Sequence, residues 1–212
     1  MRLDKKTLLL YAVTDRTWLN GRTLAFCVEE SIKGGATFVQ LREKDADFDT
    51  FLEQAKEIKS VCKKYGVPFV INDDIEVALA VDADGVHVGQ SDMEAGFVRE
   101  RLGADKIIGV STKTIEESLL AQERGADYIG VGAMFDTTTK LNASDVSFET
   151  LKEICEAVDI PVVAIGGIGL SNISEFADVD VDGVAVVSAL FATEDVKKAT
   201  KQMREQLDRI LS

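Results

Sequence analysis

Histidine and cysteine are scarce in this chain of 212 residues, which has one histidine and three cysteines. Cys27, Cys62 and Cys155 lie far apart, are odd in number and lack the spacing of metal ligands. We therefore expect buried, reduced thiols rather than a zinc site or a disulfide framework. The single histidine, His87, lies within an apolar run, where a packed and hydrogen-bonded residue is more common than a catalytic base.

The chain also lacks long apolar runs and an excess of positive charge. Near the N-terminus, Leu8, Leu9 and Leu10 form a run too short for a signal peptide or a membrane helix. The formal net charge is -13, and such a field repels nucleic acid and anionic membranes. We expect a cytoplasmic protein whose partners are small phosphorylated molecules, not nucleic acid or a membrane, and a homo-oligomer is possible.

There are only two prolines, and no linker, low-complexity segment or shift in composition divides the chain. A length of 212 residues fits one domain with a large core. We therefore expect residues 1–212 to form a single domain.

About eight short apolar runs rich in Val and Ile alternate with longer segments of helical period. Runs with little polar alternation suit strands that are buried on both faces, as in a parallel sheet. The pattern predicts the α/β class and a single (β/α)8 TIM barrel. An open doubly wound sheet is the competing fold, but the glycine-rich loop that usually follows its first strand is absent here. The clearest runs are Phe38–Leu41, Phe69–Ile71, Val86–Val88, Ile107–Val110, Tyr128–Val131, Val162–Ile165 and Val184–Val187.

A weak internal repeat supports this interpretation. Three similar segments each lead from a predicted helix into a predicted strand, which indicates a repeated βα unit. The segments are Ala83-Asp84-Gly85-Val86, Gly125-Ala126-Asp127-Tyr128 and Val181-Asp182-Gly183-Val184.

Residues suited to phosphate binding follow the last three predicted strands. Gly166-Gly167 and Val187-Ser188 occupy the two loops that usually hold phosphate in this fold. Glycine lets the main chain approach an anion, although such glycines also simply make turns. Thr137-Thr138-Thr139-Lys140 follows the sixth strand, and its hydroxyls and ammonium group suit a phosphate.

Carboxylates follow the third and fourth predicted strands. Asn72-Asp73 and Asp92 lie on adjacent loops, where two carboxylates can hold one hard cation such as Mg²⁺. The alternative, equally open from these residues alone, makes Asp92 the N-cap of a following helix.

Gln40, Arg42 and Lys44 alternate at the end of the second predicted strand, so their side chains share one side. Two cations on the pocket side are costly to bury without an anion, which favours a ligand-binding role over a pair of surface cations. Glu43 lies between them.

Taken in order, these segments resemble the thiamin phosphate synthases. Each motif is weak alone, but their ordered set is specific. The matching stretches are Tyr11-Ala12-Val13-Thr14-Asp15, Gln40-Leu41-Arg42-Glu43-Lys44, Asn72-Asp73-Asp74, His87-Val88-Gly89-Gln90 with Asp92, Gly109-Val110-Ser111, Thr137-Thr138-Thr139-Lys140, Ala164-Ile165-Gly166-Gly167-Ile168 and Gly183 through Ser188.

The resemblance implies a Mg²⁺-dependent transferase of thiamine biosynthesis. Such an enzyme joins 4-amino-2-methyl-5-hydroxymethylpyrimidine diphosphate to hydroxyethylthiazole phosphate and releases pyrophosphate. Asp73 and Asp92 would bind the metal, and Ser111, Lys140 and Arg42 would act in catalysis. The pyrimidine diphosphate would contact Gln40, Leu41, Arg42, Glu43, Lys44, Asn72, Ser111 and Lys140, and the thiazole phosphate would contact Thr137, Thr138, Thr139, Gly167, Val187 and Ser188.

The chain departs from the family pattern at two loops. Ala133 and Asp136 replace two usual prolines, which predicts a more mobile loop beside the thiazole phosphate, and Lys113 stands where many relatives have a histidine. Other functions on this fold are a thiazole tautomerase, a non-catalytic binder of thiamin precursors and a generic enzyme of phosphorylated sugars. The full diphosphate and Mg²⁺ set and the missing loop histidine argue against the tautomerase, and the intact Asp73, Asp92 and Lys140 argue against the non-catalytic binder. A generic enzyme of phosphorylated sugars would leave Asn72-Asp73 and Asp92 unexplained.

Overall fold

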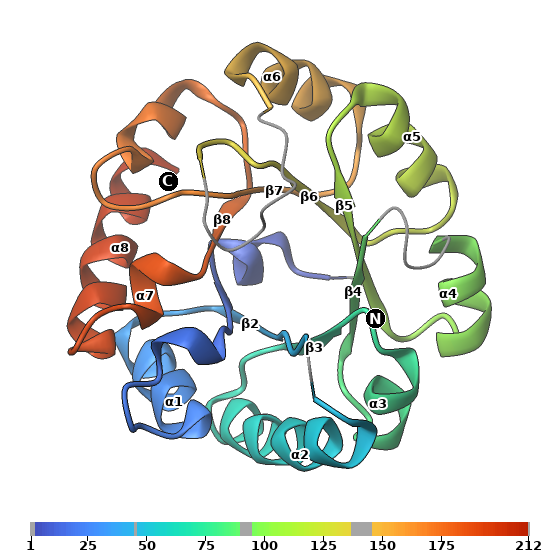
Figure 1. Cartoon of the computed structure of the whole chain (residues 1–212). Coiled ribbons are helices and arrows are strands. Elements are labelled where there is room, and N and C mark those ends of the chain that lie inside the picture. The colour runs from blue at the N-terminus through green and yellow to red at the C-terminus, as the bar shows by residue number, and fades with distance from the viewer. Residues whose placement is uncertain (1–2, 45, 90–94, 137–145, 212) are drawn as a thin grey trace.

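The computed structural model describes residues 3–44, 46–89, 95–136 and 146–211. Its eight parallel strands are hydrogen-bonded in chain order, and β1 also pairs with β8, so the sheet closes into a barrel. The helices form a ring around it (Figure 1). The predicted (β/α)8 TIM barrel is therefore confirmed, and the open sheet is excluded because a closed barrel has no edge strand.

The elements alternate along the whole chain. The strands are β1 (Leu10–Val13), β2 (Phe38–Leu41), β3 (Phe69–Asn72), β4 (Gly85–Val88), β5 (Ile107–Thr112), β6 (Tyr128–Val131), β7 (Val162–Ile165) and β8 (Gly183–Val186). The α-helices are α1 (Leu24–Gly34), α2 (Phe48–Tyr65), α3 (Ile75–Ala80), α4 (Ala95–Leu102), α5 (Ile115–Glu123), α6 (Phe148–Ala157), α7 (Ser188–Phe191) and α8 (Val196–Ile210), and short 3-10 helices are η1 (Lys5–Leu8), η2 (Arg16–Trp18) and η3 (Ile173–Asp178).

Successive residues of each strand face opposite sides of the barrel wall, which gives two apolar clusters. In β1, Leu10 and Ala12 belong to the larger cluster between the strands and the helices. Tyr11 and Val13 belong to the smaller cluster that fills the barrel. Both clusters are buried, which explains why the strands read as nearly continuous apolar runs.

Side chains that lie just before the even-numbered strands tie the base of the barrel together. In each case the main-chain N–H of this residue donates to the carbonyl of one residue in the preceding odd-numbered strand. Its side-chain oxygen in turn accepts from the main-chain N–H of that strand residue. The aspartates of the three repeated segments all make this bond, so the internal repeat has a structural cause. The four pairs are Thr37 with Leu10, Asp84 with Phe69, Asp127 with Ile108 and Asp182 with Val162.

Among the described residues, six α-helices start at a residue whose side chain accepts a hydrogen bond from the first turn, which compensates amides that lack a partner within the helix. The capping residues are Thr23, Asp47, Asp74, Thr114, Ser147 and Asp195.

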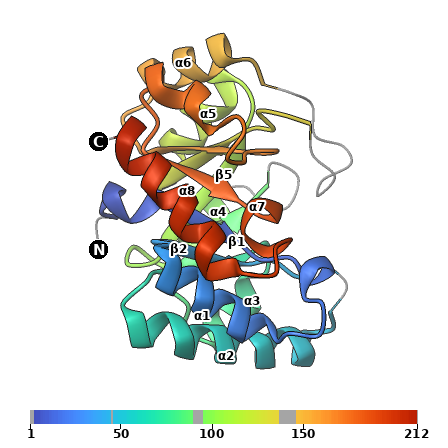
Figure 2. The ribbon, with the colours of Figure 1, turned by 90° about the vertical axis from the view of Figure 1, so that its left-hand side faces the viewer.

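In the side view, the chain termini lie at the end of the barrel opposite the loops that follow the strands (Figure 2). Within the described ranges, no helix is long and apolar enough to cross a membrane.

Candidate active site

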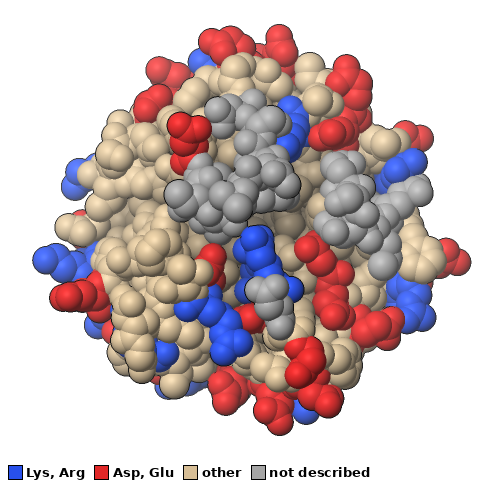
Figure 3. Space-filling view, viewed as in Figure 1, with Lys and Arg blue, Asp and Glu red and all other residues tan. Residues whose placement is uncertain are grey.

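The residues singled out in the sequence lie at the carboxyl ends of the strands, which all open on one face of the barrel. This face is the one at which enzymes of this fold carry out their chemistry. Viewed onto this face, Lys and Arg side chains gather near its middle, with acidic side chains close by (Figure 3).

A cavity of about 820 Å³ lies beside the ends of β2 and β3. It brings together side chains predicted to bind the diphosphate with one predicted metal ligand. Ala46, Phe51, Ile75 and Phe97 add apolar surface to its wall. The polar lining residues are Arg42, Glu43, Lys44, Asn72, Asp73, Asp74, Glu76 and Arg101.

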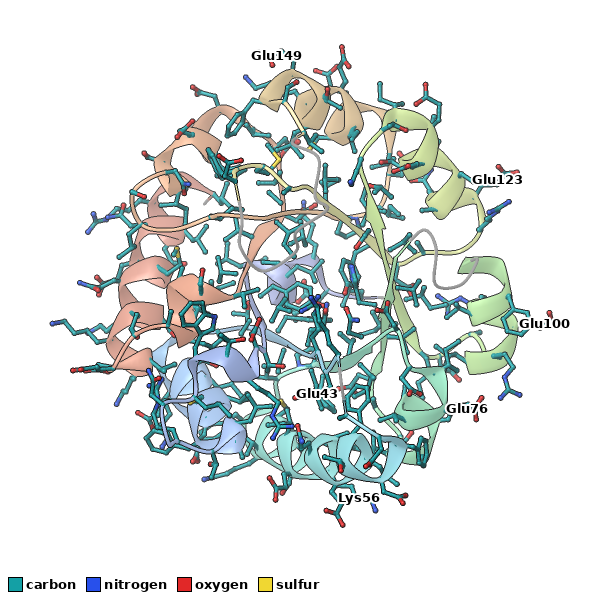
Figure 4. All side chains as sticks on the ribbon, viewed as in Figure 1. Glu43, Lys56, Glu76, Glu100, Glu123 and Glu149 are labelled. Carbon is teal, nitrogen blue, oxygen red and sulfur yellow. The ribbon has the colours of Figure 1, made fainter. Side chains whose placement is uncertain are left out.

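Several charged side chains around this cavity form ion pairs. Arg101 pairs with Glu76 at its outer side. The Arg16 guanidinium lies 3.6 Å from the carboxylate of Glu43, whose side chain is only 5 % exposed. Glu43 lies inside the ring of helices near β2, whereas the other labelled side chains project outward from helices (Figure 4). Arg42 and the exposed Lys44, which follow β2, also line this cavity, and their cations suit an anion there.

Asp73 has a left-handed backbone, with φ of 61°, directly after β3. Aspartate tolerates this region better than most residues, and such backbone is common at functional sites. The Asp73 amide donates to the His87 carbonyl at 2.9 Å. The Asn72 side-chain amide donates to the Asp73 carboxylate at 2.5 Å. These bonds hold an exposed carboxylate at the edge of the cavity.

Gln40 and Ser111 are connected through the inside of the barrel by Tyr11, Tyr128 and His87. We call these five residues the inner polar chain. The Gln40 Nε2 donates to the Tyr11 hydroxyl at 2.6 Å, and the two tyrosine hydroxyls lie 2.8 Å apart. The His87 Nδ1 lies 2.9 Å from the Tyr128 hydroxyl, and its Nε2 lies 2.9 Å from the Ser111 Oγ.

Burial raises the pKa of both phenols of the inner polar chain, Tyr11 and Tyr128, well above the ordinary value. Tyr11 and Tyr128 therefore stay protonated at any physiological pH. Each hydroxyl is available as one donor and as an acceptor, as a continuous chain of hydrogen bonds requires.

Leu41 has a different orientation from its neighbours in the second strand. Its side chain is fully buried in the cluster between strands and helices. Only its main chain can therefore face a ligand in the barrel mouth.

The loops after β7 and β8 surround a second part of the mouth. Gly167 has φ of 66°, and a Cβ there would lie 2.6 Å from the Asp136 carbonyl oxygen. Glycine is therefore required at this position both by the backbone and by the close approach of the neighbouring loop. The exposed Ser188 begins α7 directly after Val187.

The described part of the loop after β6 is attached to the loop after β7, although it lacks the two prolines. The Met134 amide donates to the Ile165 carbonyl at 3.0 Å, and the Phe135 amide donates to the Gly166 carbonyl at 3.1 Å. The Phe135 ring packs edge-on against Phe148 and Phe176. These contacts hold residues 134–135, which lie between the two positions, 133 and 136, where the family pattern has proline.

Five of the predicted site residues, Asp92, Thr137, Thr138, Thr139 and Lys140, lie outside the described residues. Across the described ranges, no three His, Cys, Asp or Glu side chains form a group that could hold a metal.

Comparison with known proteins now decides the family. Residues 10–190 match the family described as thiamine monophosphate synthase. The chain belongs to this family. It is 52% identical over 194 residues to a thiamine-phosphate synthase of Clostridium tetani, covering 92% of this chain and 93% of that protein. It is 52% identical over 198 residues to one of Alkaliphilus oremlandii, covering 93% of this chain and 95% of that protein.

A solved structure agrees. The thiamine phosphate pyrophosphorylase from Pyrococcus furiosus superimposes with a TM-score of 0.91 at 40% sequence identity, covering 98% of this chain and 99% of that one. The resemblance inferred from the sequence motifs is thus confirmed.

In this member of the thiamine monophosphate synthase family, sequence reasoning missed the two tyrosines of the inner polar chain. Tyr11 and Tyr128 lie in apolar strands, where an aromatic residue is expected to be simply core. A signal was present, because Tyr11 shares its inward side with Val13, and a buried phenol needs a hydrogen-bond partner. The expectation that His87 is packed and hydrogen-bonded is confirmed.

Proposed function

We propose that this chain condenses 4-amino-2-methyl-5-hydroxymethylpyrimidine diphosphate with hydroxyethylthiazole phosphate in the barrel mouth, with Mg²⁺ as cofactor. The products are thiamin phosphate and pyrophosphate. Membership of the thiamine monophosphate synthase family supports the reaction. The observation that carries the assignment to this site is the cavity in which Arg42, Lys44, Asn72 and Asp73 meet. We further propose that the chain acts as one domain in the cytoplasm.

Arg42 and Lys44 bind the diphosphate in this proposal. Arg42 offers a planar fork of donors that matches phosphate oxygens, and Lys44 adds a mobile point charge. Asn72 and Glu43 line the same cavity, the Leu41 main chain would contact the diphosphate, and Lys140 would add a further cation. Because pyrophosphate leaves with negative charge, side chains that already hold this charge lower the barrier to its departure.

The residues present fit Mg²⁺. Asp73 supplies an exposed, oriented carboxylate at the cavity edge, and Asp92 would supply the second one. Mg²⁺ prefers one or two carboxylates together with water and substrate phosphate oxygens, and this donor set leaves room for both. When bound, the ion would neutralise charge on the diphosphate.

Gly167, Val187 and Ser188 hold the thiazole phosphate in this proposal, together with Thr137, Thr138 and Thr139. Gly167 is exposed, and because it has no side chain its main chain can approach an anion. An anchored phosphate lets the thiazole nitrogen lie in line with the departing pyrophosphate, and this orientation removes much of the entropic barrier.

We propose a dissociative displacement without a covalent enzyme intermediate. The aminopyrimidine ring is electron-rich and stabilises a methylene cation as the C–O bond breaks, and the thiazole nitrogen then attacks this carbon. The chain need only bind, orient and exclude water in such a reaction. Recovery of a pyrimidine covalently attached to the chain after a quenched turnover would contradict this mechanism.

A coupled assay tests the proposed function. Thiamin phosphate and pyrophosphate should appear in equal amounts when both substrates and Mg²⁺ are present, and neither should appear when a chelator removes the metal. Asp73→Asn keeps the size of the side chain and tolerates the left-handed backbone, but it removes the charge. It should reduce turnover at limiting Mg²⁺ without lowering the unfolding temperature. Unchanged dependence on Mg²⁺ in this variant would refute the metal assignment.

A further inference from the structure

The inner polar chain has a single direction of hydrogen bonding. Its first link sets this direction, because the Gln40 Nε2 can only donate and the Tyr11 oxygen must accept. The Tyr11 proton is then directed to its other partner, the Tyr128 oxygen, 2.8 Å away. Tyr128 in turn donates to the His87 Nδ1, so this nitrogen carries no proton.

A neutral imidazole carries one proton, and in this arrangement it lies on Nε2. The His87 Nε2 therefore donates to the Ser111 Oγ, 2.9 Å away. The serine hydroxyl proton is left for a partner other than His87. The opposite direction would use the serine proton on His87 and would make Ser111 an acceptor toward everything else.

We propose that Tyr11, Tyr128 and His87 are positioning residues that keep His87 in its Nε2-protonated form and thereby make Ser111 a hydrogen-bond donor toward the reaction site. The effect on catalysis rests on the proposed function, in which Gln40 and Ser111 both contact the pyrimidine diphosphate. The direction of hydrogen bonding along the inner polar chain does not depend on the substrate. An oriented donor is favourable where negative charge develops as pyrophosphate leaves.

The barrel interior holds this chain in place. A Cβ at Gly109 would lie 2.1 Å from the Tyr128 ring, so the phenol occupies the space that a side chain in β5 would fill. The Tyr11 ring packs edge-on against Phe38 with centroids 4.6 Å apart, and Phe38 packs against Tyr128 at 5.8 Å. Both phenols also stay protonated because burial raises their pKa. This packing fixes the positions of the rings and of their oxygens, and the Gln40 amide sets the direction of hydrogen bonding along them.

The single histidine makes the direction measurable. In full-length protein labelled with ¹⁵N-histidine, every imidazole signal in the two-bond ¹H–¹⁵N spectrum belongs to His87. At pH 8 we expect one tautomer, with a protonated Nε2 and an unprotonated Nδ1. A protonated Nδ1, alone or together with Nε2, would overturn the proposal without any need for a variant.

Activity measurements test the consequence for Ser111. Tyr128→Phe removes the donor to His87, so it should yield a mixture of tautomers and lower kcat/KM for the pyrimidine diphosphate by about 2- to 20-fold. The KM for the thiazole phosphate should stay unchanged. The matched control is Tyr65→Phe, which removes an exposed phenol that bonds to Glu29 and should change neither quantity. An equal effect of the two variants would overturn the positioning role.

Two substitutions of the histidine separate donation from packing. His87→Gln places an amide N–H near the former Nε2, whereas His87→Asn is too short to reach Ser111. Glutamine should restore more kcat than asparagine, and equal activities would contradict donation to Ser111. If the unmodified protein makes no thiamin phosphate, the proposed function fails, while the tautomer measurement still decides the direction of the chain.

Discussion

Removing the Asp127 side chain should weaken the base of the barrel without touching the active site. Its carboxylate accepts from the Ile108 amide at 2.8 Å and from the Arg99 guanidinium at 2.6 Å. Ile108 is fully buried, so Asp127→Ala leaves a strand amide without this acceptor, which costs about 1–3 kcal/mol. The Arg99 pair is about a quarter exposed and contributes about 1 kcal/mol at most.

The sum predicts a loss of about 1–4 kcal/mol in the free energy of unfolding. For a domain of this size that corresponds to a decrease in Tm of about 2–16 °C. Thermal and urea unfolding of the full chain would measure both quantities. The kcat at 25 °C should stay close to that of the unmodified protein, because Asp127 precedes β6 and the site lies at the opposite ends of the strands.

Two control variants make this result decisive. Asp127→Asn keeps an oxygen that accepts from Ile108 and should lose about 1 kcal/mol or less. Asp208→Ala breaks an exposed pair with Arg204 on α8 and should lose about 0.5 kcal/mol. If Asp127→Ala is no more destabilising than Asp208→Ala, the four ties at the barrel base do not stabilise the fold as argued.

The remaining predictions concern the site and the thiols. Arg42→Gln should raise the KM for the pyrimidine diphosphate at least tenfold in steady-state assays, whereas Arg101→Gln, in the same cavity but paired with Glu76, should raise it far less. Gly167→Ala should raise the KM for the thiazole phosphate, whereas Gly21→Ala, with a similar φ but open space around its Cβ, should not. Cys27 and Cys62 are buried as expected, whereas Cys155 is only partly buried. Burial raises the pKa of the Cys62 thiol to about 12 and that of the Cys27 thiol above its ordinary value, so both neutral thiols should resist a disulfide reagent at pH 8 until the protein unfolds. Rapid labelling of either thiol in the native protein would contradict this.

Much of the fold was predictable because it depends on local patterns. A strand buried on both faces must be apolar throughout, and eight such runs alternating with amphipathic helices leave few arrangements other than a closed barrel. The strand ends were equally predictable, because parallel strands place all their carboxyl ends on one face. This is why Arg42 was associated with Asn72 and Asp73 from the sequence, although Arg42 follows β2 and the other two lie at the end of β3.

The same rules could not reveal the inner polar chain. Gln40, Tyr11, Tyr128, His87 and Ser111 come from five different strands, and no spacing in the sequence relates a residue of β1 to one of β6. The repeated aspartates show a similar limit. Their pattern was visible as an internal repeat, but its cause, a bond to the N–H of the preceding odd strand, involves a second segment each time.

The amino-acid sequence by itself determined the (β/α)8 class, the family and the loops that carry polar residues, since periodicity and ordered motifs are properties of neighbouring residues. Only the tertiary structure decided which of those residues meet. It turned the Leu41 side chain away from the mouth, and it joined Gln40 to Ser111 through two buried phenols and an imidazole. The physical reason is that barrel closure sets the register between strands, and distances across the barrel exist only once the sheet has closed.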